Sequence, residues 1–278
     1  MHDIHTHLYL PQYDADRDAV IARAHAAGID HMFVIGCTVE ESRACVVLAE
    51  KYPEIFASVG IHPHEFNEEK SWNKAHIAES IQALKNLIEG SKKIIAIGEC
   101  GLDYSSHKPD KTISVEQKAR QREGFLAQIT LASELGLPLI VHCRDAYADM
   151  FEILKAQSAQ LKAVILHCYM GDTEVTKTFL ELKNVYFSFA GNITYPVRSI
   201  IAGTKDDLTE TVRLVPLDRL FVETDCPFLA PQVVRGERNE PASVRHVAQA
   251  VALFKETSAE VVAEAVSENV RFVFGKLT

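Results

Sequence analysis

Six of the twelve histidines in this chain of 278 residues lie at or just beyond the ends of short apolar runs. His5 and His7 alternate along the first run, so an extended strand places both side chains on the same face. Three further runs end in histidine, and carboxylates follow two more. These residues are His62, His64, Glu99, Asp103, His142, His167 and Asp225. Their side chains are those that hold divalent cations or transfer protons in enzymes.

A cation would explain several features that a plain core does not. Asp3, His5 and His7 would all point inward from a strand that should fill the interior. Glu99 ends an apolar stretch, and a buried carboxylate without a partner costs several kcal/mol. Because imidazoles and carboxylates suit Mg²⁺, Mn²⁺ or Zn²⁺, we predict two divalent ions about 3.5–4 Å apart that share one carboxylate. The predicted ligands are His5, His7, Glu99, His142, His167 and Asp225.

Each of these residues also has an ordinary structural interpretation, which the sequence alone leaves open. The two alternating histidines would then be satisfied polar residues, Glu99 would form a salt bridge, and Asp225 would cap a helix. In the metal interpretation, Asp3 and Glu223 lie one layer below the ligands and support them without binding the ions.

Eight apolar runs rich in β-forming residues must position these side chains, and helical patterns fill most of the gaps. Several runs are apolar at consecutive positions, which is typical of parallel strands covered on both faces. The alternation predicts a parallel (β/α)₈ TIM barrel in one domain over residues 1–278, with an open doubly wound sheet as the alternative. The predicted strands are Asp3–Leu8, His31–Cys37, Phe56–His62, Ile94–Leu102, Leu139–Cys143, Ala163–Cys168, Val185–Ala190 and Leu220–Cys226.

The helix boundaries follow from capping residues. Asp14 is the predicted N-cap of the first helix, and Asp145 and Asp172 are the predicted caps of the fifth and sixth. Two helical stretches, Pro241–Phe254 and Ser258–Phe274, close the chain. Residues 105–112 and 204–211 are expected to be loop insertions that alter substrate choice.

The composition is that of an ordinary globular protein, with 47% hydrophobic and 24% charged residues. The net charge of −9 argues against nonspecific duplex binding, which depends on neutralising phosphates. No apolar run approaches the roughly 18 residues of a membrane span, and no secretory signal is recognisable, so we expect a cytoplasmic protein. The six cysteines form no CxxC motif and are expected to be buried thiols, with Cys143 and Cys168 pointing outward at the helices.

Motifs spread from residue 3 to residue 244 resemble those of the TatD family of metal-dependent hydrolases, within the wider amidohydrolase-like group. They are Asp3-Ile-His5-Thr-His7-Leu, Gly60-Ile-His62-Pro-His64, Ala96-Ile-Gly-Glu99-Cys-Gly-Leu-Asp103-Tyr, Phe125-Leu-Ala-Gln-Ile, His142-Cys-Arg144-Asp-Ala, His167-Cys-Tyr-Met-Gly171, Glu223-Thr-Asp225-Cys-Pro-Phe-Leu-Ala-Pro231 and Arg238-Asn-Glu-Pro241-Ala-Ser-Val. Each motif is weak alone, but together and in this order they are very specific.

The resemblance implies a TIM-like barrel with a divalent-metal centre that hydrolyses phosphodiester bonds in nucleic acid. The family's ligand positions match His5, His7, Glu99 and Asp225 for one ion and Glu99, His142 and His167 for the other. His62 and Arg144 match positions close to the bound phosphate or the scissile bond.

The favoured hypothesis is a metal-dependent deoxyribonuclease in which a metal-bound water, with its pKa lowered to about 7, supplies hydroxide. Asp225 is the predicted general base, and Glu99 is the second predicted catalytic carboxylate. An acidic balance and a single tryptophan, Trp72, offer no stacking platform, so we expect single strands or ends to be bound rather than long duplex. The protein is expected to be a monomer or a small homo-oligomer.

The main alternative is a small-molecule amidohydrolase or phosphotriesterase-like hydrolase with the same metal centre. Many of those enzymes bridge their metals with a carboxylated lysine on the fourth strand, where this chain has Glu99. A third hypothesis is a non-catalytic role, in which the metals are structural or the barrel serves as a binding partner, but structural zinc sites are usually rich in cysteine.

Overall fold

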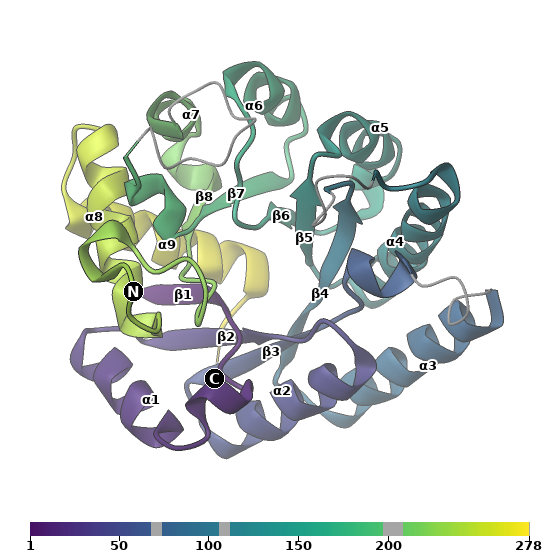
Figure 1. Ribbon diagram of the computed structural model, residues 1–278, viewed down its shortest axis with the longest axis horizontal. Helices are drawn as coiled ribbons and strands as arrows, with labels where there is room; N and C mark the ends of the chain where they lie inside the picture. The colour runs from purple at the N-terminus through teal and green to yellow at the C-terminus, as the bar shows by residue number, and fades with distance from the viewer. Residues whose placement is uncertain (68–73, 106–111, 197–207, 278) are drawn as a thin grey trace.

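The computed structural model describes residues 1–67, 74–105, 112–196 and 208–277. Within these ranges, eight parallel strands follow one another in chain order in a single sheet. The first and last strands also meet, because Thr6 and Cys226 form a parallel bridge and the amide of His7 donates to the carbonyl of Cys226 at 2.8 Å. Figure 1 shows the resulting ring of strands with helices around it. The predicted TIM barrel is confirmed.

The strands lie where the apolar runs predict them. They are β1 His2–Thr6, β2 His31–Ile35, β3 Ile55–Val59, β4 Ile94–Asp103, β5 Leu139–Arg144, β6 Val164–Leu166, β7 Val185–Phe189 and β8 Leu220–Val222. Strands β3 and β4 are buried at every position, since the barrel interior covers one face and the helices cover the other. Strand β8 ends four residues before the predicted boundary, because the chain leaves the sheet ahead of Asp225.

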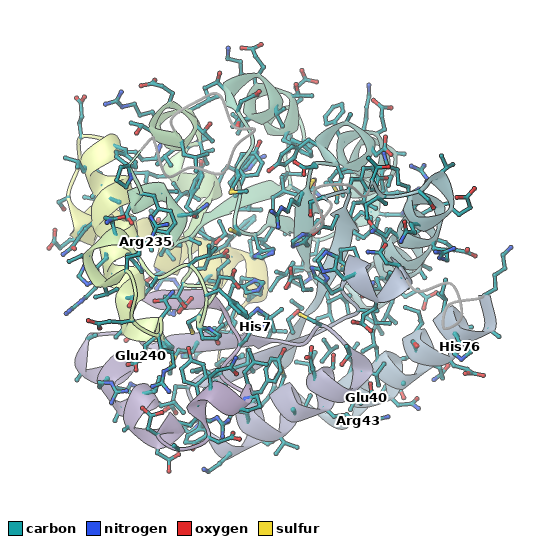
Figure 2. All side chains as sticks on the ribbon, in the orientation of Figure 1. His7, Glu40, Arg43, His76, Arg235 and Glu240 are labelled. Carbon is teal, nitrogen blue, oxygen red and sulfur yellow. The ribbon has the colours of Figure 1, made fainter. Side chains whose placement is uncertain are left out.

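The helices fill the crossovers between strands and form the outer layer. They are α1 Arg17–Ala26, α2 Val39–Lys51, α3 Lys74–Gly90, α4 Val115–Leu135, α5 Tyr147–Gln157, α6 Thr173–Leu180, α7 Leu208–Leu214, α8 Val244–Phe254 and α9 Ala259–Phe274. In Figure 2, His7 lies near the middle of the barrel, whereas His76 lies on α3 at the edge of the molecule. The barrel therefore collects only some of the histidines at its centre.

Of the three predicted helix caps, only Asp172 is confirmed, because its side chain accepts a hydrogen bond from the amide of Val175. The prediction for Asp14 is wrong, since α1 begins later and the Asp14 carboxylate pairs with Arg17 at 2.6 Å. The prediction for Asp145 is also wrong, because this residue adopts a φ of +53° two residues before α5 begins. Such local choices depend on loop geometry that a sequence pattern does not contain.

The loop predictions are only partly covered by the structure. Residues 106–111 and 204–207, together with Trp72, lie outside the described residues. The end of the second expected insertion is helical, because Leu208 to Thr211 belong to α7. None of the helices that the structure describes is long and apolar enough to cross a bilayer.

The absence of a side chain at Gly101 allows β4 to approach β5 closely beside His142. Its φ is +139°, and a Cβ atom there would lie 2.0 Å from the carbonyl oxygen of His142. Only glycine satisfies both conditions without displacing the neighbouring backbone. This close approach lets β4 and β5 present Glu99 and His142 side by side.

Candidate metal centre

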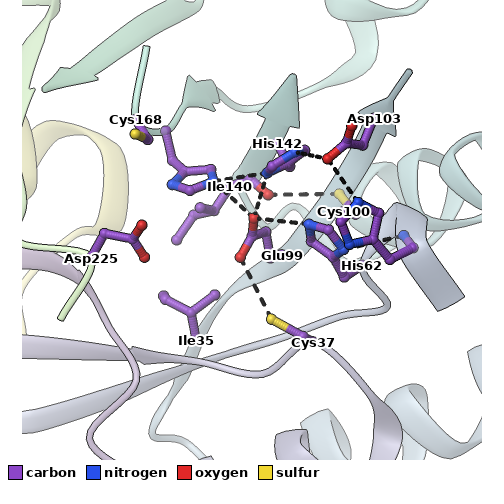
Figure 3. Close-up of polar contacts among 12 residues, drawn as sticks. Ile35, Cys37, His62, Glu99, Cys100, Asp103, Ile140, His142, Cys168 and Asp225 are labelled. Carbon is purple, nitrogen blue, oxygen red and sulfur yellow. Dashed lines mark hydrogen bonds and ion pairs between the residues drawn. The ribbon is translucent and has the colours of Figure 1, made fainter. Parts of the chain in front are cut away.

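Glu99 is the residue on which the polar cluster converges. Its Oε1 atom lies 2.8 Å from His167 Nε2, 2.9 Å from His142 Nδ1 and 3.4 Å from His62 Nε2. Figure 3 shows these contacts, which come from strands β4 and β5 and from the segments after β3 and β6. One carboxylate oxygen therefore faces three imidazoles from different parts of the barrel.

The other oxygen of Glu99 faces the first two strands. Oε2 lies 3.4 Å from His5 Nε2 and 3.6 Å from Cys37 Sγ. On the far side of His5, Asp225 Oδ1 lies 3.7 Å from His5 Nε2 and 3.3 Å from His7 Nε2. The two oxygens of Glu99 thus face separate groups of donors, the arrangement expected for a carboxylate shared between two cations.

Asp225 is held where the last strand meets the first. Its φ of +55° is uncommon for a residue other than glycine, and its amide donates to the carbonyl of His5 at 2.9 Å. Beneath it, the Asp3 carboxylate accepts hydrogen bonds from the amide of Thr224 at 2.9 Å and from its hydroxyl at 2.6 Å. The amide of His5 also points to Asp3 Oδ1, at 3.4 Å. Asp3 therefore fixes the backbone on both sides of the seam.

Hydrogen bonds on the far ring nitrogens orient two of the imidazoles. His167 Nδ1 lies 3.3 Å from Glu223 Oε1, which also accepts a bond from the amide of Cys168 at 2.7 Å. His7 Nδ1 lies 3.1 Å from the carbonyl oxygen of Ile35. In both residues Nε2 is therefore left to face the cluster, as in metal sites where an outer partner orients each histidine.

The electrostatics of the cluster favour ionised carboxylates. Burial alone would raise the pKa of Glu99, but the buried imidazole of His167 and its neighbours hold it well below its usual value. Burial would likewise raise the pKa of Asp225, yet the hydrogen bond from His7 lowers it. Burial raises the energy of a charged His5 and so lowers its pKa, and His167 adds to this. Glu99 in turn raises the pKa of His167 well above its usual value, although burial opposes this, and bound cations would take over this balancing role with release of protons.

The donors present fit divalent cations. Both ring nitrogens of His5 are buried and, within the described ranges, have no hydrogen-bond partner, which is costly unless they bind a ligand. Among the described residues, four overlapping groups of three have ligand atoms within 4.8 Å of one another, and three of the groups include Glu99. The groups are His5–Glu99–His167, His5–His7–Asp225, His7–Cys37–Glu99 and His62–Glu99–His142.

Three cysteines lie at the cluster or beside it, although the sequence predicts that Cys143 and Cys168 point outward at the helices. Cys37 belongs to one of the candidate groups, and Cys143 and Cys168 both line a cavity beside the cluster. The alternation of side chains applies only within a strand, and β6 ends before Cys168, whose φ is +43°. Cys143 is the second-last residue of β5, where the strand borders the loops that form the cavity.

The cavity has a volume of about 440 Å³. Its lining residues are His142, Cys143, Arg144, His167, Cys168, Met170, Asn192, Tyr195, Leu208, Asp225, Phe228, Leu229 and Arg235. A substrate in this cavity would therefore contact Arg144. His62 instead contacts Glu99 inside the cluster. Phe228 is 52% exposed although it lines this cavity.

Asp103 and His64 are functional candidates that the sequence places at strand ends but that are not among the predicted ligands or catalytic residues. Asp103 Oδ2 lies 2.8 Å from His64 Nε2 and 3.0 Å from His142 Nε2. Burial would raise the pKa of Asp103, but hydrogen bonds from these two histidines hold it far below its usual value. The spacing of four residues between Glu99 and Asp103 on one strand, which places both on one face, was the signal in the sequence.

Comparisons with known proteins agree with this geometry. The family profile described as TatD related DNase matches residues 2–275. A curated relative from Bacillus subtilis, named as an uncharacterized metal-dependent hydrolase YabD, is 37% identical, with 98% of each chain covered. Another, from Erwinia tasmaniensis, is named as a 3'-5' ssDNA/RNA exonuclease TatD and is 36% identical, with 99% of each chain covered.

A solved structure gives the same result in three dimensions. The crystal structure of YJJV, a TatD homologue from Escherichia coli, superimposes with a TM-score of 0.85 at 25% identity. The match covers 99% of this chain and 98% of the other. The chain therefore belongs to the family of TatD-related DNases.

Proposed function

We propose that this protein is a divalent-metal-dependent nuclease that hydrolyses phosphodiester bonds in single-stranded nucleic acid, with DNA as the first candidate. The observation that carries the proposal is the convergence of five barrel segments on Glu99 and Asp225, where the buried ring nitrogens of His5 have no hydrogen-bond partner among the described residues. Two of the named relatives act, by their names, as a metal-dependent hydrolase and as an exonuclease on single strands. The same cluster beside a cavity supports that chemistry in this chain.

Two cations would share the cluster. His5, His7 and Asp225 would hold one ion, His142 and His167 would hold the other, and Glu99 would contribute one oxygen to each. Mg²⁺, Mn²⁺ and Zn²⁺ all accept these donors. When bound, such ions act as Lewis acids that lower the pKa of water and offset charge on a phosphate.

Asp225 is the residue best placed to take a proton from the attacking water. Its carboxylate lines the cavity, and its lowered pKa keeps it ionised and able to accept a proton at neutral pH. Arg144 lines the same cavity and would offer its planar guanidinium to a phosphate oxygen. His62 would act from within the cluster, beside Glu99, as a ligand or a hydrogen-bond donor.

Asp3 and Glu223 would position the ligands rather than react. Asp3 holds the backbone at the seam through Thr224, and Glu223 holds the ring of His167. This separation predicts that changes at the two groups affect different quantities. Loss of Glu223 should weaken metal binding, whereas loss of Asp225 should abolish turnover.

We also infer the setting of the enzyme. The chain would act as one catalytic domain over residues 1–278, as a monomer or small homo-oligomer in the cytoplasm. All six cysteines are free thiols, which fits a reducing compartment.

The test is hydrolysis of labelled single-stranded oligonucleotides by protein that has been stripped of metal and then reloaded. Mg²⁺, Mn²⁺ or Zn²⁺ should restore cleavage, and elemental analysis should give about two ions per chain. DNA and RNA strands labelled at either end would define the sugar preference and the polarity. No cleavage above the level of an Asp225→Ala variant, with amides, lactones and triesters hydrolysed instead, would favour the small-molecule alternative.

A further inference from the structure

The cavity beside the metal cluster contains a half-exposed aromatic ring that the proposed chemistry does not use. Phe228 follows Asp225 by three residues and is 52% exposed, although it lines the cavity. Its ring centroid lies 6.0 Å from that of His7, and the two planes are inclined at 66°. An open aromatic face is therefore fixed next to a candidate metal ligand.

The backbone around Phe228 holds this ring in place despite its exposure. The amide of Phe228 donates to the carbonyl of Asp225 at 3.0 Å. Its carbonyl accepts a bond from the side-chain amide of Asn239 at 2.6 Å, and that same amide binds the carbonyl of Thr224 at 3.0 Å. The backbone that carries the ring is thus tied to the segment that positions Asp225, which keeps the ring beside the metal cluster.

Cationic side chains complete the lining of the cavity. The guanidinium carbon of Arg235 lies 4.1 Å from the centre of the Tyr195 ring, and the Tyr195 hydroxyl is anchored on the carbonyl of Ala230 at 2.9 Å. Arg235 Nη1 donates to Gln232 Oε1 at 3.4 Å, and in the part of the chain that the structure describes neither Arg235 nor Arg144 forms an ion pair with a carboxylate. Two guanidinium groups without acidic partners are a feature of a site that receives an anion.

We propose that this cavity is a subsite for one unpaired nucleotide, with its base stacked on Phe228 and its flanking phosphates bound by Arg235 and Arg144. The inference rests on the proposed nuclease function and specifies its substrate. A volume of about 440 Å³ lies near the lower end of the range for small-molecule pockets and fits a single nucleotide. Because a stacking face is open only on a base that has left the duplex, the subsite selects single strands and frayed ends.

The first experiment compares single-stranded oligonucleotides that differ only in one terminal nucleotide, which either carries its base or is abasic. The wild-type protein should have a KM roughly 5- to 150-fold lower for the base-bearing strand, the range expected for one stacked base. Phe228→Ala should remove this difference, and Phe228→Trp should restore it. Val233→Ala is the matched control, since Val233 is 69% exposed in the same loop and does not line the cavity.

A small chromogenic phosphodiester that lacks a base separates this inference from the proposed function. Phe228→Ala should leave its kcat close to the wild-type value, because the metal chemistry does not involve the ring. Equal losses of activity on the base-bearing strand, the abasic strand and the chromogenic ester would overturn the subsite. Loss of all hydrolysis by the metal-loaded wild-type protein would instead overturn the proposed function.

A binding measurement tests the subsite without turnover. In an Asp225→Ala background, a strand ending in a fluorescent adenine analogue should lose fluorescence on binding, because stacking on an aromatic ring quenches it. Adding Phe228→Ala should abolish the quenching, and circular dichroism would verify that the barrel still folds. Binding with unquenched fluorescence in the presence of Phe228 would contradict the proposal.

Discussion

Two groups of histidines lie at different levels of the same barrel, and they differ in their partners. His5 and His7 lie among carboxylates in the cluster around Glu99. His2, three residues before His5 on β1, stacks instead on His31 of β2, with ring centroids 5.0 Å apart and planes inclined at 7°. Their Nδ1 atoms lie 3.1 Å apart, as in one imidazole donating a hydrogen bond to another.

The charges of the two groups follow from these partners. Burial lowers the pKa of His2 to about 4 and also lowers that of His31, and no described carboxylate lies within ion-pair distance of either ring. The cluster around Glu99 instead combines buried acids with imidazoles that balance them. Histidine alone therefore does not indicate a metal site in this fold. The carboxylates beyond the strand interiors are what distinguish the two groups.

The largest expected effect is on turnover. Asp225→Asn should reduce nuclease activity by about 10²- to 10⁴-fold, because general-base catalysis contributes about that much. Initial rates on a labelled single strand with saturating metal would measure the loss. His31→Gln, in the pair without carboxylates, should keep wild-type activity, and a comparable loss there would erase the distinction between the two groups.

A smaller effect is expected on metal affinity. Glu223→Gln should weaken binding of the ions by about 10- to 100-fold, because the outer partner of His167 would lose its charge. Titration calorimetry with Mn²⁺ on stripped protein would measure the change. His2→Gln serves as the control, and an unchanged affinity in Glu223→Gln would show that the His167 ring needs no such support.

Metal binding should also stabilise the fold through the cluster. At a free metal concentration 100 times the dissociation constant, the free energy of unfolding should rise by about 2.7 kcal/mol for each independent site. Denaturant titrations with and without Mn²⁺ would detect this gain. The gain should shrink in His5→Ala and persist in His31→Gln, and a loss in the latter would place an ion at the wrong group.

The smallest effect concerns pH and the paired histidines. The pKa of His2 in the folded state lies below that of an unfolded histidine, about 6.5, so the unfolded chain binds more protons between these values. Stability must therefore fall as the pH falls from about 6.5 towards 4, by about 2 kcal/mol for His2 between pH 7 and 5. Denaturant midpoints across this range should fall less steeply in His2→Gln than in the wild type. Identical slopes would mean that His2 titrates normally in the fold.

Much of the fold could be predicted because parallel barrel strands are buried on both faces. Ile94–Ile97 and Val164–Leu166 are uninterrupted apolar runs, and the structure places both within strands. Polar residues at the ends of such runs stand out, which is why Glu99 and Asp225 could be chosen without coordinates. The structure brings these residues together, while their action as ligands stays a prediction.

The remaining features depend on the conformation of the loops beyond the strands. The periodicity of apolar residues does not predict that conformation. Phe228 and Arg235 lie beyond β8 in a segment without regular alternation, so no sequence pattern places them around one cavity. Cys168 reaches the cavity because the strand has ended and its φ is positive. Strand alternation could predict that Asp103 lies on the same face as Glu99. It could not predict the partner of Asp103, because His64 comes from the turn Pro63–Asn67 after β3.

The seam between β1 and β8 has a consequence for how the activity arises during synthesis. Two candidate ligands come from the first seven residues, and Asp225 comes from the segment whose amide pairs with His5 to close the ring. Until that segment leaves the ribosome and docks, the proposed set of ligands for one ion would be incomplete and the proposed general base would be missing. A nascent or C-terminally clipped chain would thus be unable to cut nucleic acid, including the message from which it is being translated.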